Sequence, residues 1–298
     1  MTKPKIGIAL GSGGARGWSH IGVLRGLEDL GIEPDYIAGC SMGALVGAAR
    51  AGGRLDELEE WALTLTPAKA AMMVDMNFLH GGLVDAKPLI KFFEKLDMPE
   101  MIEDLEIPYI SVATDMRSGK EIWLKDGPMI EAMRASISLP GVVSPVFKDG
   151  RWLLDGGMSN PLPVSVCRAM GADVVIAVNP EGKPDDLMWQ EPAPNEAWEA
   201  VKSAMNLPLR TALATLNVGM PKSGPKAPNY FDVVAMSIDL MIDRIRRNRL
   251  ERDPPDVLIE VELDRFTILE FLRAEEAIAE GRAAVAAMES EIEKALIG

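Results

Sequence analysis

The sequence predicts an α/β fold in which a mostly parallel sheet is covered by helices on both faces. Three observations carry this prediction: short apolar runs alternate with helical patterns, glycine clusters follow the first apolar runs, and the composition is that of a globular chain. The 298 residues are 48% hydrophobic and 26% charged, which is enough to build a sizeable core. Strands that alternate with helices indicate βαβ units, whose parallel strands are buried on both sides.

The first elements follow this alternation. Lys5–Leu10 is expected to be a buried strand, because it is apolar and ends in a glycine cluster. His20–Leu30 predicts a helix with apolar residues at every third position and Gly31 just beyond its end. Tyr36–Gly39 predicts a second short strand, and a helix is expected to run from there through Ala51.

The middle of the chain continues in the same way. The expected helices are 55–65, 87–96, 128–136 and Val164–Met170, and the expected strands are Ile107–Thr114, Glu121–Leu124 and Asp173–Val178. Val146–Leu154 is expected to form a hairpin, because Asp149 and Gly150 make a favourable turn between two apolar runs.

The composition changes in segment 181–230, which is rich in prolines. We interpret this segment as an insertion in a single domain that spans residues 5–298. Its apolar residues are typical of a lid or a membrane-contact segment, and a packed or partner-binding region is the alternative. After it, Val257–Leu263 alternates as a last strand, and Phe266–Leu296 is expected to be helical apart from Gly281.

Residues 231–252 predict a helix with an apolar stripe and a cluster of arginines. The stripe, which is expected to pack on the core, consists of Phe231, Val234, Ile238, Met241 and Ile245. The arginines are Arg244, Arg246, Arg247, Arg249 and Arg252. Anionic headgroups are one partner for them, but the end of the helix and nearby acids such as Asp243 and Glu251 are favoured.

Charge and cysteine content limit the partners and the location that we expect. The formal net charge is −14, so nucleic acid is not expected as a partner, and general attraction to anionic membrane is disfavoured. Cys40 and Cys167 make no disulfide framework and fit a reducing cytosol. The apolar run within Met1–Leu10 is too short for a secretion signal, so none is expected there. No apolar run approaches the roughly 20 residues that cross a bilayer. We expect a cytoplasmic protein, with peripheral contact at the inner face of the membrane as an open alternative and no oligomeric state implied.

Gly39–Gly43 fits the pattern G-x-S-x-G, with Ser41 at its centre. A strand precedes it and a helix of small residues follows, as a nucleophile elbow requires. Ser41 would then lie at a helix N-terminus, where free N–H groups favour developing negative charge. The alternative is that Ser41 only caps its helix.

A glycine-rich turn, Gly11–Gly17, follows the first strand directly. A dinucleotide loop is excluded by spacing, because the third glycine of G-x-G-x-x-G would fall at Arg16. Successive backbone N–H groups in such a turn can hold an anion, including the oxyanion of acyl transfer. Three roles are open for Arg16: it holds this loop, it faces a phosphate, or it only bonds surface carbonyls.

A nucleophilic serine needs a base, and the chain has only two histidines, His20 and His80. His20 begins a helix and His80 stands beside two glycines, so structural roles are favoured for both, although spacing excludes neither. The other candidate is Asp155, which ends an apolar strand and precedes Gly156 and Gly157. Asp-Gly-Gly is most often an ordinary turn, but burial at this position would raise the pKa of the carboxyl and make it a better base.

Together these residues resemble the patatin-like phospholipase family. Gly11–Gly17 resembles its oxyanion block, Gly39–Gly43 its nucleophile elbow, Ala135–Pro140 its A-S-x-(small)-x-P block, and Asp155–Gly157 its aspartate block. The four blocks occur in the family's order, and residues 18–24 resemble a small bacterial branch related to neuropathy target esterase.

The resemblance implies a three-layer α/β/α fold and a Ser-Asp dyad that hydrolyses acyl esters of phospholipids or lysophospholipids, with no metal or cofactor. Ser41 is then the nucleophile and Asp155 the base. The implied oxyanion donors are Gly13, Gly14 and Ala15, with Met42 added as elbows generally do, and the supporting residues are Gly11, Arg16, Gly39, Gly43, Gly156 and Gly157. Acyl transfer from the same acyl-serine, or a regulatory adaptor that retains the fold, are the alternatives.

Overall fold

The computed structural model describes residues 3–66, 87–182, 230–263, 266 and 270–297. An eight-stranded sheet forms its centre. Its strands are β1 (Ile6–Leu10), β2 (Tyr36–Cys40), β3 (Tyr109–Asp115), β4 (Glu121–Leu124), β5 (Val146–Lys148), β6 (Arg151–Asp155), β7 (Val174–Gly182) and β8 (Val257–Glu262). The order is β5-β6-β3-β2-β1-β7-β8, with β4 also paired to β3.

The sheet is parallel in its centre and antiparallel at one edge. β1 pairs in parallel with β2 and β7, β2 with β3, and β7 with β8. β4 and β6 pair antiparallel with β3, and β5 pairs antiparallel with β6 to form the expected hairpin. The prediction of a mostly parallel sheet is therefore confirmed.

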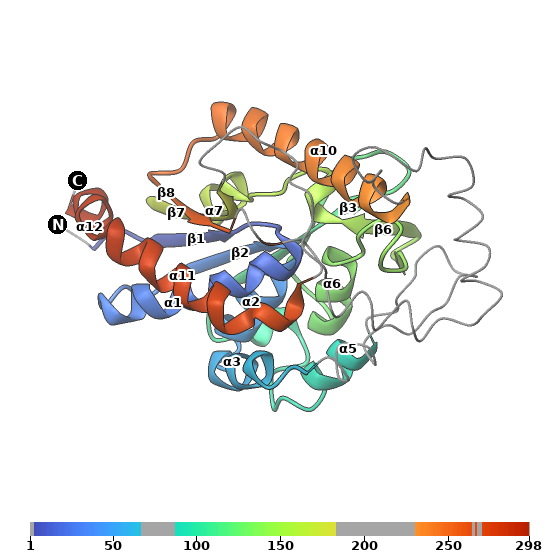
Figure 1. Cartoon of the computed structure of the whole chain (residues 1–298), viewed down its shortest axis with the longest axis horizontal. Coiled ribbons are helices and arrows are strands. Elements are labelled where there is room, and N and C mark those ends of the chain that lie inside the picture. The colour runs from blue at the N-terminus through green and yellow to red at the C-terminus, as the bar shows by residue number, and fades with distance from the viewer. Residues whose placement is uncertain (1–2, 67–86, 183–229, 264–265, 267–269, 298) are drawn as a thin grey trace, which may run out of the picture.

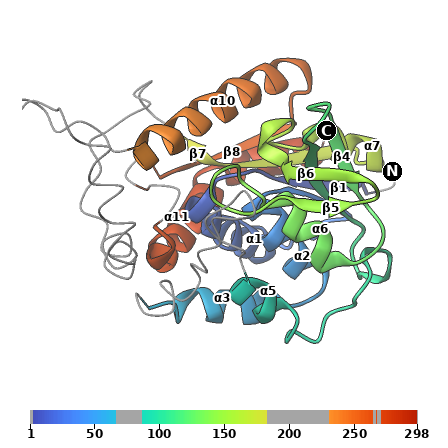
Figure 2. The same ribbon diagram turned by 90° about the vertical axis from the view of Figure 1, so that its right-hand side faces the viewer.

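Helices cover both faces of this sheet (Figures 1 and 2). One face carries α7 (Val164–Met170) and α10 (Tyr230–Arg252). The other face carries α1 (Ser19–Asp29), α2 (Met42–Ala51), α3 (Leu55–Leu63), α5 (Lys87–Phe93), α6 (Met129–Ser136) and α11 (Ala274–Ala287). The chain ends in α12 (Glu289–Ile297). This arrangement is the expected three-layer α/β/α fold.

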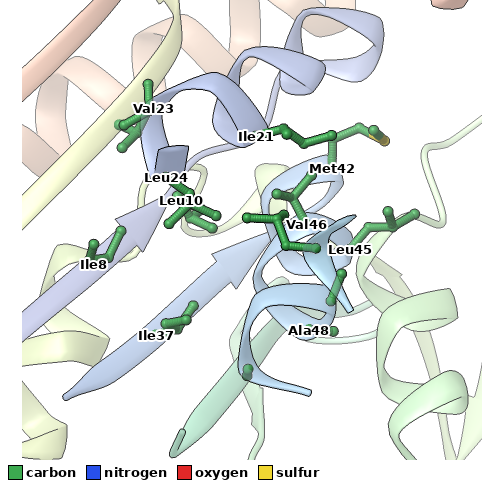
Figure 3. Packing of buried hydrophobic residues seen from close by; sticks show 14 of the residues in the cluster. Ile8, Leu10, Ile21, Val23, Leu24, Ile37, Met42, Leu45, Val46 and Ala48 are labelled. Carbon is green, nitrogen blue, oxygen red and sulfur yellow. The ribbon is translucent and has the colours of Figure 1, made fainter. Parts of the chain in front are cut away.

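The period of two along β1 explains how the sheet separates two cores. Ile8 and Leu10 belong to the larger core and pack beneath α1 and α2 (Figure 3). Ala9 faces the opposite way and belongs to the smaller core, which includes residues of α7. Successive side chains of a strand point to opposite faces, so one short apolar run is buried on both sides.

The close packing of α1 against α11 corrects the expected helix break at Gly281. Gly281 lies inside α11, and a Cβ added there would come within 2.2 Å of the carbonyl oxygen of Ser19. Gly22 in α1 is equally crowded, because its added Cβ would lie 1.9 Å from the carbonyl oxygen of Ile278. The glycine allows two helix backbones to approach, and the helix is interrupted at Met288 instead.

The inward face of α10 differs from the expected apolar stripe. Ile238 is buried, but Met241 is 51% exposed. The buried positions next to Ile238 and Ile242 carry charged side chains instead, among them Asp239 and Asp243. The apolar pattern did not predict the buried face of α10 correctly, because this face contacts the buried side chain of Arg16 rather than an apolar surface.

The predicted insertion is bounded by regular structure at both ends. Residues 181 and 182 still belong to β7, and residue 230 begins α10. The interpretation of residues 183–229 as a lid or membrane-contact segment concerns residues that lie outside the described part of the chain, as does His80. Among the described residues, no helix has the length and apolar character needed to cross a membrane.

Candidate active site

Ser41 lies at the turn between β2 and α2, where the chain reverses direction sharply. Its backbone has φ 55° and ψ −124°, a conformation that non-glycine residues rarely adopt and that costs about 1–3 kcal/mol. The turn lies close to the end of β1, since a Cβ added at Gly43 would lie 2.2 Å from the carbonyl oxygen of Leu10. At Gly39 the added Cβ would lie 2.4 Å from the Cα of Ala44. Both glycines of the G-x-S-x-G pattern are thus required by space.

The register of β3 brings Asp155 next to this turn. Val112 pairs with Cys40 on β2, and the following residue, Ala113, pairs with Asp155 on β6. β4 occupies the other edge of β3 at both positions, so β2 and β6 share one edge and meet end to end. The residue after Cys40 is Ser41, which therefore emerges beside Asp155.

The two side chains are in direct contact. Ser41 Oγ donates a hydrogen bond of 2.7 Å to Asp155 Oδ2. Asp155 Oδ1 accepts a second hydrogen bond of 2.8 Å from the N–H of Gly157. Asp155 is 1% exposed and Ser41 is 9% exposed, so the carboxylate is more deeply buried than the serine.

Burial sets the protonation behaviour of Asp155. Loss of hydration disfavours the charged form and raises the pKa of Asp155 from 3.8 to about 6, against the hydrogen bonds from Ser41 and Gly157, which lower it. The charge of Glu181 raises the pKa further. A carboxylate of this kind is a stronger base than an exposed aspartate and is still mostly ionised at pH 7.

The glycine-rich loop packs against the elbow. A Cβ added at Gly17 would lie 2.3 Å from the Cβ of Met42, so the loop directly adjoins the first turn of α2. Gly14 has φ 54° and starts a 3₁₀ turn that runs to Trp18. Among the hydrogen bonds of the described residues, none uses the N–H groups of Gly13, Gly14, Ala15 or Met42 as donors. These groups can therefore serve an anion.

The remaining glycines of the predicted site have structural roles. The N–H of Gly11 donates to the carbonyl oxygen of Val178 at 3.0 Å, which ties the loop to β7. A Cβ at Gly156 would lie 2.3 Å from the carbonyl oxygen of Val112. Gly157 supplies the N–H that holds Asp155.

The side chain of Arg16 belongs to a buried network of charged and amide side chains. We call this the Arg16 network, and it consists of Arg16, Asn179, Glu181, Asp239, Asp243 and Arg246. Arg16 pairs with Glu181 and with Asp239, each at 3.3 Å. Its Nε donates to the carbonyl oxygen of Phe266 at 2.9 Å. Of the three roles considered for Arg16, the contacts match the one in which it holds the loop.

Arg246 forms the other end of the Arg16 network. Its Nη1 donates to Glu181 Oε2 at 2.9 Å and to Asn179 Oδ1 at 2.6 Å, and Nη2 pairs with Asp243. Of the arginine cluster of α10, Arg246, Arg247, Arg249 and Arg252 pair with acids, as favoured. No local pattern in the sequence indicates a role for Glu181 or Asp239, because their partner Arg16 stands 165 or 223 positions earlier in the chain.

His20 forms its side-chain hydrogen bond with the glycine-rich loop and not with Ser41. Its ring is fully buried, and Nε2 lies 2.7 Å from the carbonyl oxygen of Gly11. Because a carbonyl oxygen only accepts, Nε2 carries the hydrogen. Burial lowers the pKa of His20 to about 4, so the ring is neutral near pH 7. His20 supports the glycine-rich loop from behind, and Asp155 is the titratable side chain that meets Ser41.

A serine at a sharp strand-to-helix turn, facing a buried carboxylate and a loop with free N–H groups, is the arrangement of a serine hydrolase. The family model of patatin-like phospholipases matches residues 8–168. The chain belongs to the patatin-like phospholipase family, and this membership places it among lipid hydrolases in general terms.

Similar proteins agree with this assignment. An NTE family protein of Mycobacterium tuberculosis is 35% identical over 95% of this chain and 90% of its own length. Human patatin-like phospholipase domain-containing protein 6 is 36% identical over 60% of this chain, which corresponds to 14% of that protein. The crystal structure of VipD from Legionella pneumophila has the same fold, with a TM-score of 0.50 at 13% identity over 97% of this chain and 67% of VipD.

Proposed function

We propose that this protein is a serine esterase that hydrolyses acyl ester bonds of phospholipids or lysophospholipids. The observation that carries the proposal is the 2.7 Å hydrogen bond from Ser41 Oγ to Asp155 Oδ2 at a strained elbow. Ser41 is the nucleophile and Asp155 is the base. The N–H groups of Gly13, Gly14, Ala15 and Met42 are the oxyanion donors.

The first half of the reaction acylates Ser41. Asp155 accepts the proton of Ser41 Oγ as the oxygen attacks the carbonyl carbon of the lipid ester. The carbonyl oxygen becomes negatively charged and is stabilised by the free N–H groups of the glycine-rich loop, each worth about 3–4 kcal/mol. When the tetrahedral intermediate collapses, Asp155 returns the proton to the leaving alcohol, which departs as the deacylated lipid.

The second half releases the fatty acid. Asp155 takes a proton from a water molecule as that water attacks the carbonyl carbon of the acyl-serine. The same N–H groups stabilise the second oxyanion, and its collapse breaks the bond to Ser41 Oγ. The proton held by Asp155 passes to Ser41, so one ester and one water become one acid and one alcohol.

Hydrolysis of a short-chain p-nitrophenyl ester and of a lysophospholipid tests this function. Ser41→Ala is expected to lower kcat by more than about 10⁴-fold, because it removes the oxygen that forms the acyl intermediate. Ser118→Ala, which changes an exposed turn serine, is the matched control and should retain wild-type rates. Wild-type protein that is inert on every ester would overturn the proposal and favour the adaptor, whereas transfer of the acyl chain to added glycerol would favour the acyltransferase.

Activity should fall below about pH 6, because the base must be ionised and burial raises the pKa of Asp155 to about 6. The pKa of His20 is lowered to about 4, so an acidic limb near pH 6 does not belong to His20. The measurement is kcat/KM between pH 4 and 9, with the melting temperature recorded at each pH. His80→Gln is the control, since an ordinary histidine titrates in the same range. A limb near pH 4 would contradict the prediction.

A further inference from the structure

The residues that hold Ser41 and Asp155 in place meet in one short segment at the end of α6. Ser136 Oγ accepts a hydrogen bond of 2.9 Å from the backbone N–H of Ser41. Two residues later, the carbonyl oxygen of Ser138 accepts a hydrogen bond of 2.9 Å from the backbone N–H of Asp155. Segment 136–138 therefore contacts the backbone of both members of the proposed dyad.

This segment is itself held firmly. Ser136 Oγ donates to the carbonyl oxygen of Val112 on β3 at 2.6 Å. Ser138 Oγ lies within hydrogen-bond distance of the carbonyl oxygens of Arg134 and Ser144, at 2.8 and 3.1 Å. Both serines are fully buried, so water cannot replace these bonds. The hydroxyl of Ser136 thus links β3 to the nucleophile elbow.

The strained backbone of Ser41 makes this link necessary. A residue with φ 55° stays in place only when its surroundings hold it there. Ser41 precedes the first residue of α2, and its N–H group has no partner within that helix. Ser136 provides the acceptor for this N–H. Without that acceptor, the buried N–H loses its hydrogen bond, and the elbow can relax toward an ordinary conformation that aims Oγ elsewhere.

We propose that Ser136 is a positioning residue, which fixes the backbone of Ser41 so that Oγ stays aligned with Asp155. The inference rests on the proposed function, in which Ser41 is the nucleophile. Ser136 acts through Ser41 and has no contact with substrate. Its removal should therefore change the rate of the chemical step rather than the binding of lipid.

The test compares Ser136→Ala with Ser111→Ala. Ser111 is also fully buried, and its Oγ donates to the carbonyl oxygen of Ala132 in α6 at 3.2 Å, with no hydrogen bond to Ser41. For Ser136→Ala we expect kcat to fall by about 10–100-fold at unchanged KM, because a small misplacement of the nucleophile is costly. Ser111→Ala should keep kcat, with a similar loss of melting temperature. Ser136→Cys, which retains a weak acceptor of similar size, should fall between wild type and Ser136→Ala.

Unchanged kcat in Ser136→Ala, or an equal loss in Ser111→Ala, would overturn the inference. Failure of the proposed function is a separate outcome, because it would appear as wild-type protein without esterase activity. The inference is then decided by amide hydrogen exchange at Ser41, which needs no substrate. Faster exchange at Ser41 in Ser136→Ala than in Ser111→Ala supports the positioning role, and equal exchange contradicts it.

Discussion

Asp155→Asn should lower kcat by about 10²–10⁴-fold while leaving the protein folded, because it removes the base and keeps the shape of the side chain. Asparagine can still accept a hydrogen bond from the N–H of Gly157, as Asp155 does at 2.8 Å. It cannot take the proton of Ser41, whose Oγ lies 2.7 Å from the carboxylate. Steady-state kinetics on a soluble ester would measure the loss.

The stability of this variant separates lost chemistry from lost structure. Burial raises the pKa of Asp155, so its charged form is less stable in the folded chain than in the unfolded chain, and this cost applies fully above about pH 6. At pH 8, Asp155→Asn should therefore melt at the wild-type temperature or higher. A large drop in melting temperature would show that the carboxylate of Asp155 stabilises the folded chain instead.

Asp149→Asn is the matched control for this experiment. Asp149 lies at the tip of the same hairpin, is exposed, and has φ 49°, a backbone conformation that asparagine tolerates as well as aspartate. The same chemical change should leave both kcat and melting temperature unaltered. Asp155→Asn with full activity would assign the base to another residue.

Arg16→Met should lower the free energy of unfolding by about 3–5 kcal/mol, because it breaks a buried ion pair from one side. Asp239 would lose its contact of 3.3 Å to Arg16, and Glu181 would lose its contact to Arg16 and keep the one to Arg246. Asp239 is 7% exposed and Glu181 5%, so water does not replace the guanidinium. Urea denaturation would measure the change.

The double variant Arg16→Met/Asp239→Leu should recover part of this loss, since it removes the carboxylate that has lost its contact to Arg16. Arg117→Met, at an exposed turn, makes the same substitution where no buried pair is broken and should stay within about 0.5 kcal/mol of wild type. A loss below about 1 kcal/mol for Arg16→Met would mean that the network contributes little to stability.

The order of strands and helices could be predicted because it depends on local patterns. The apolar run of β1 and the alternation of β8 each determine a strand within a few residues. The G-x-S-x-G pattern of the elbow is also local, and Gly39 is required by a contact within the turn, to Ala44. Gly43, in contrast, is required by its contact with Leu10 at the end of β1. Gly281 was misjudged because its role is to admit the backbone of α1, which no pattern within α11 reveals.

The sequence by itself therefore determined the fold class, the elbow with Ser41 and a short set of possible bases. Only the tertiary structure decided between His20 and Asp155, the two candidate bases that it describes, because the choice depends on strand register. Cys40 and Asp155 pair with adjacent residues of β3, which brings Asp155 beside Ser41. The same holds for Arg16, whose carboxylate partners come from β7 and α10. The packing of the sheet and the helices determines which residues more than 100 positions apart lie close together, and local periodicity does not predict these contacts.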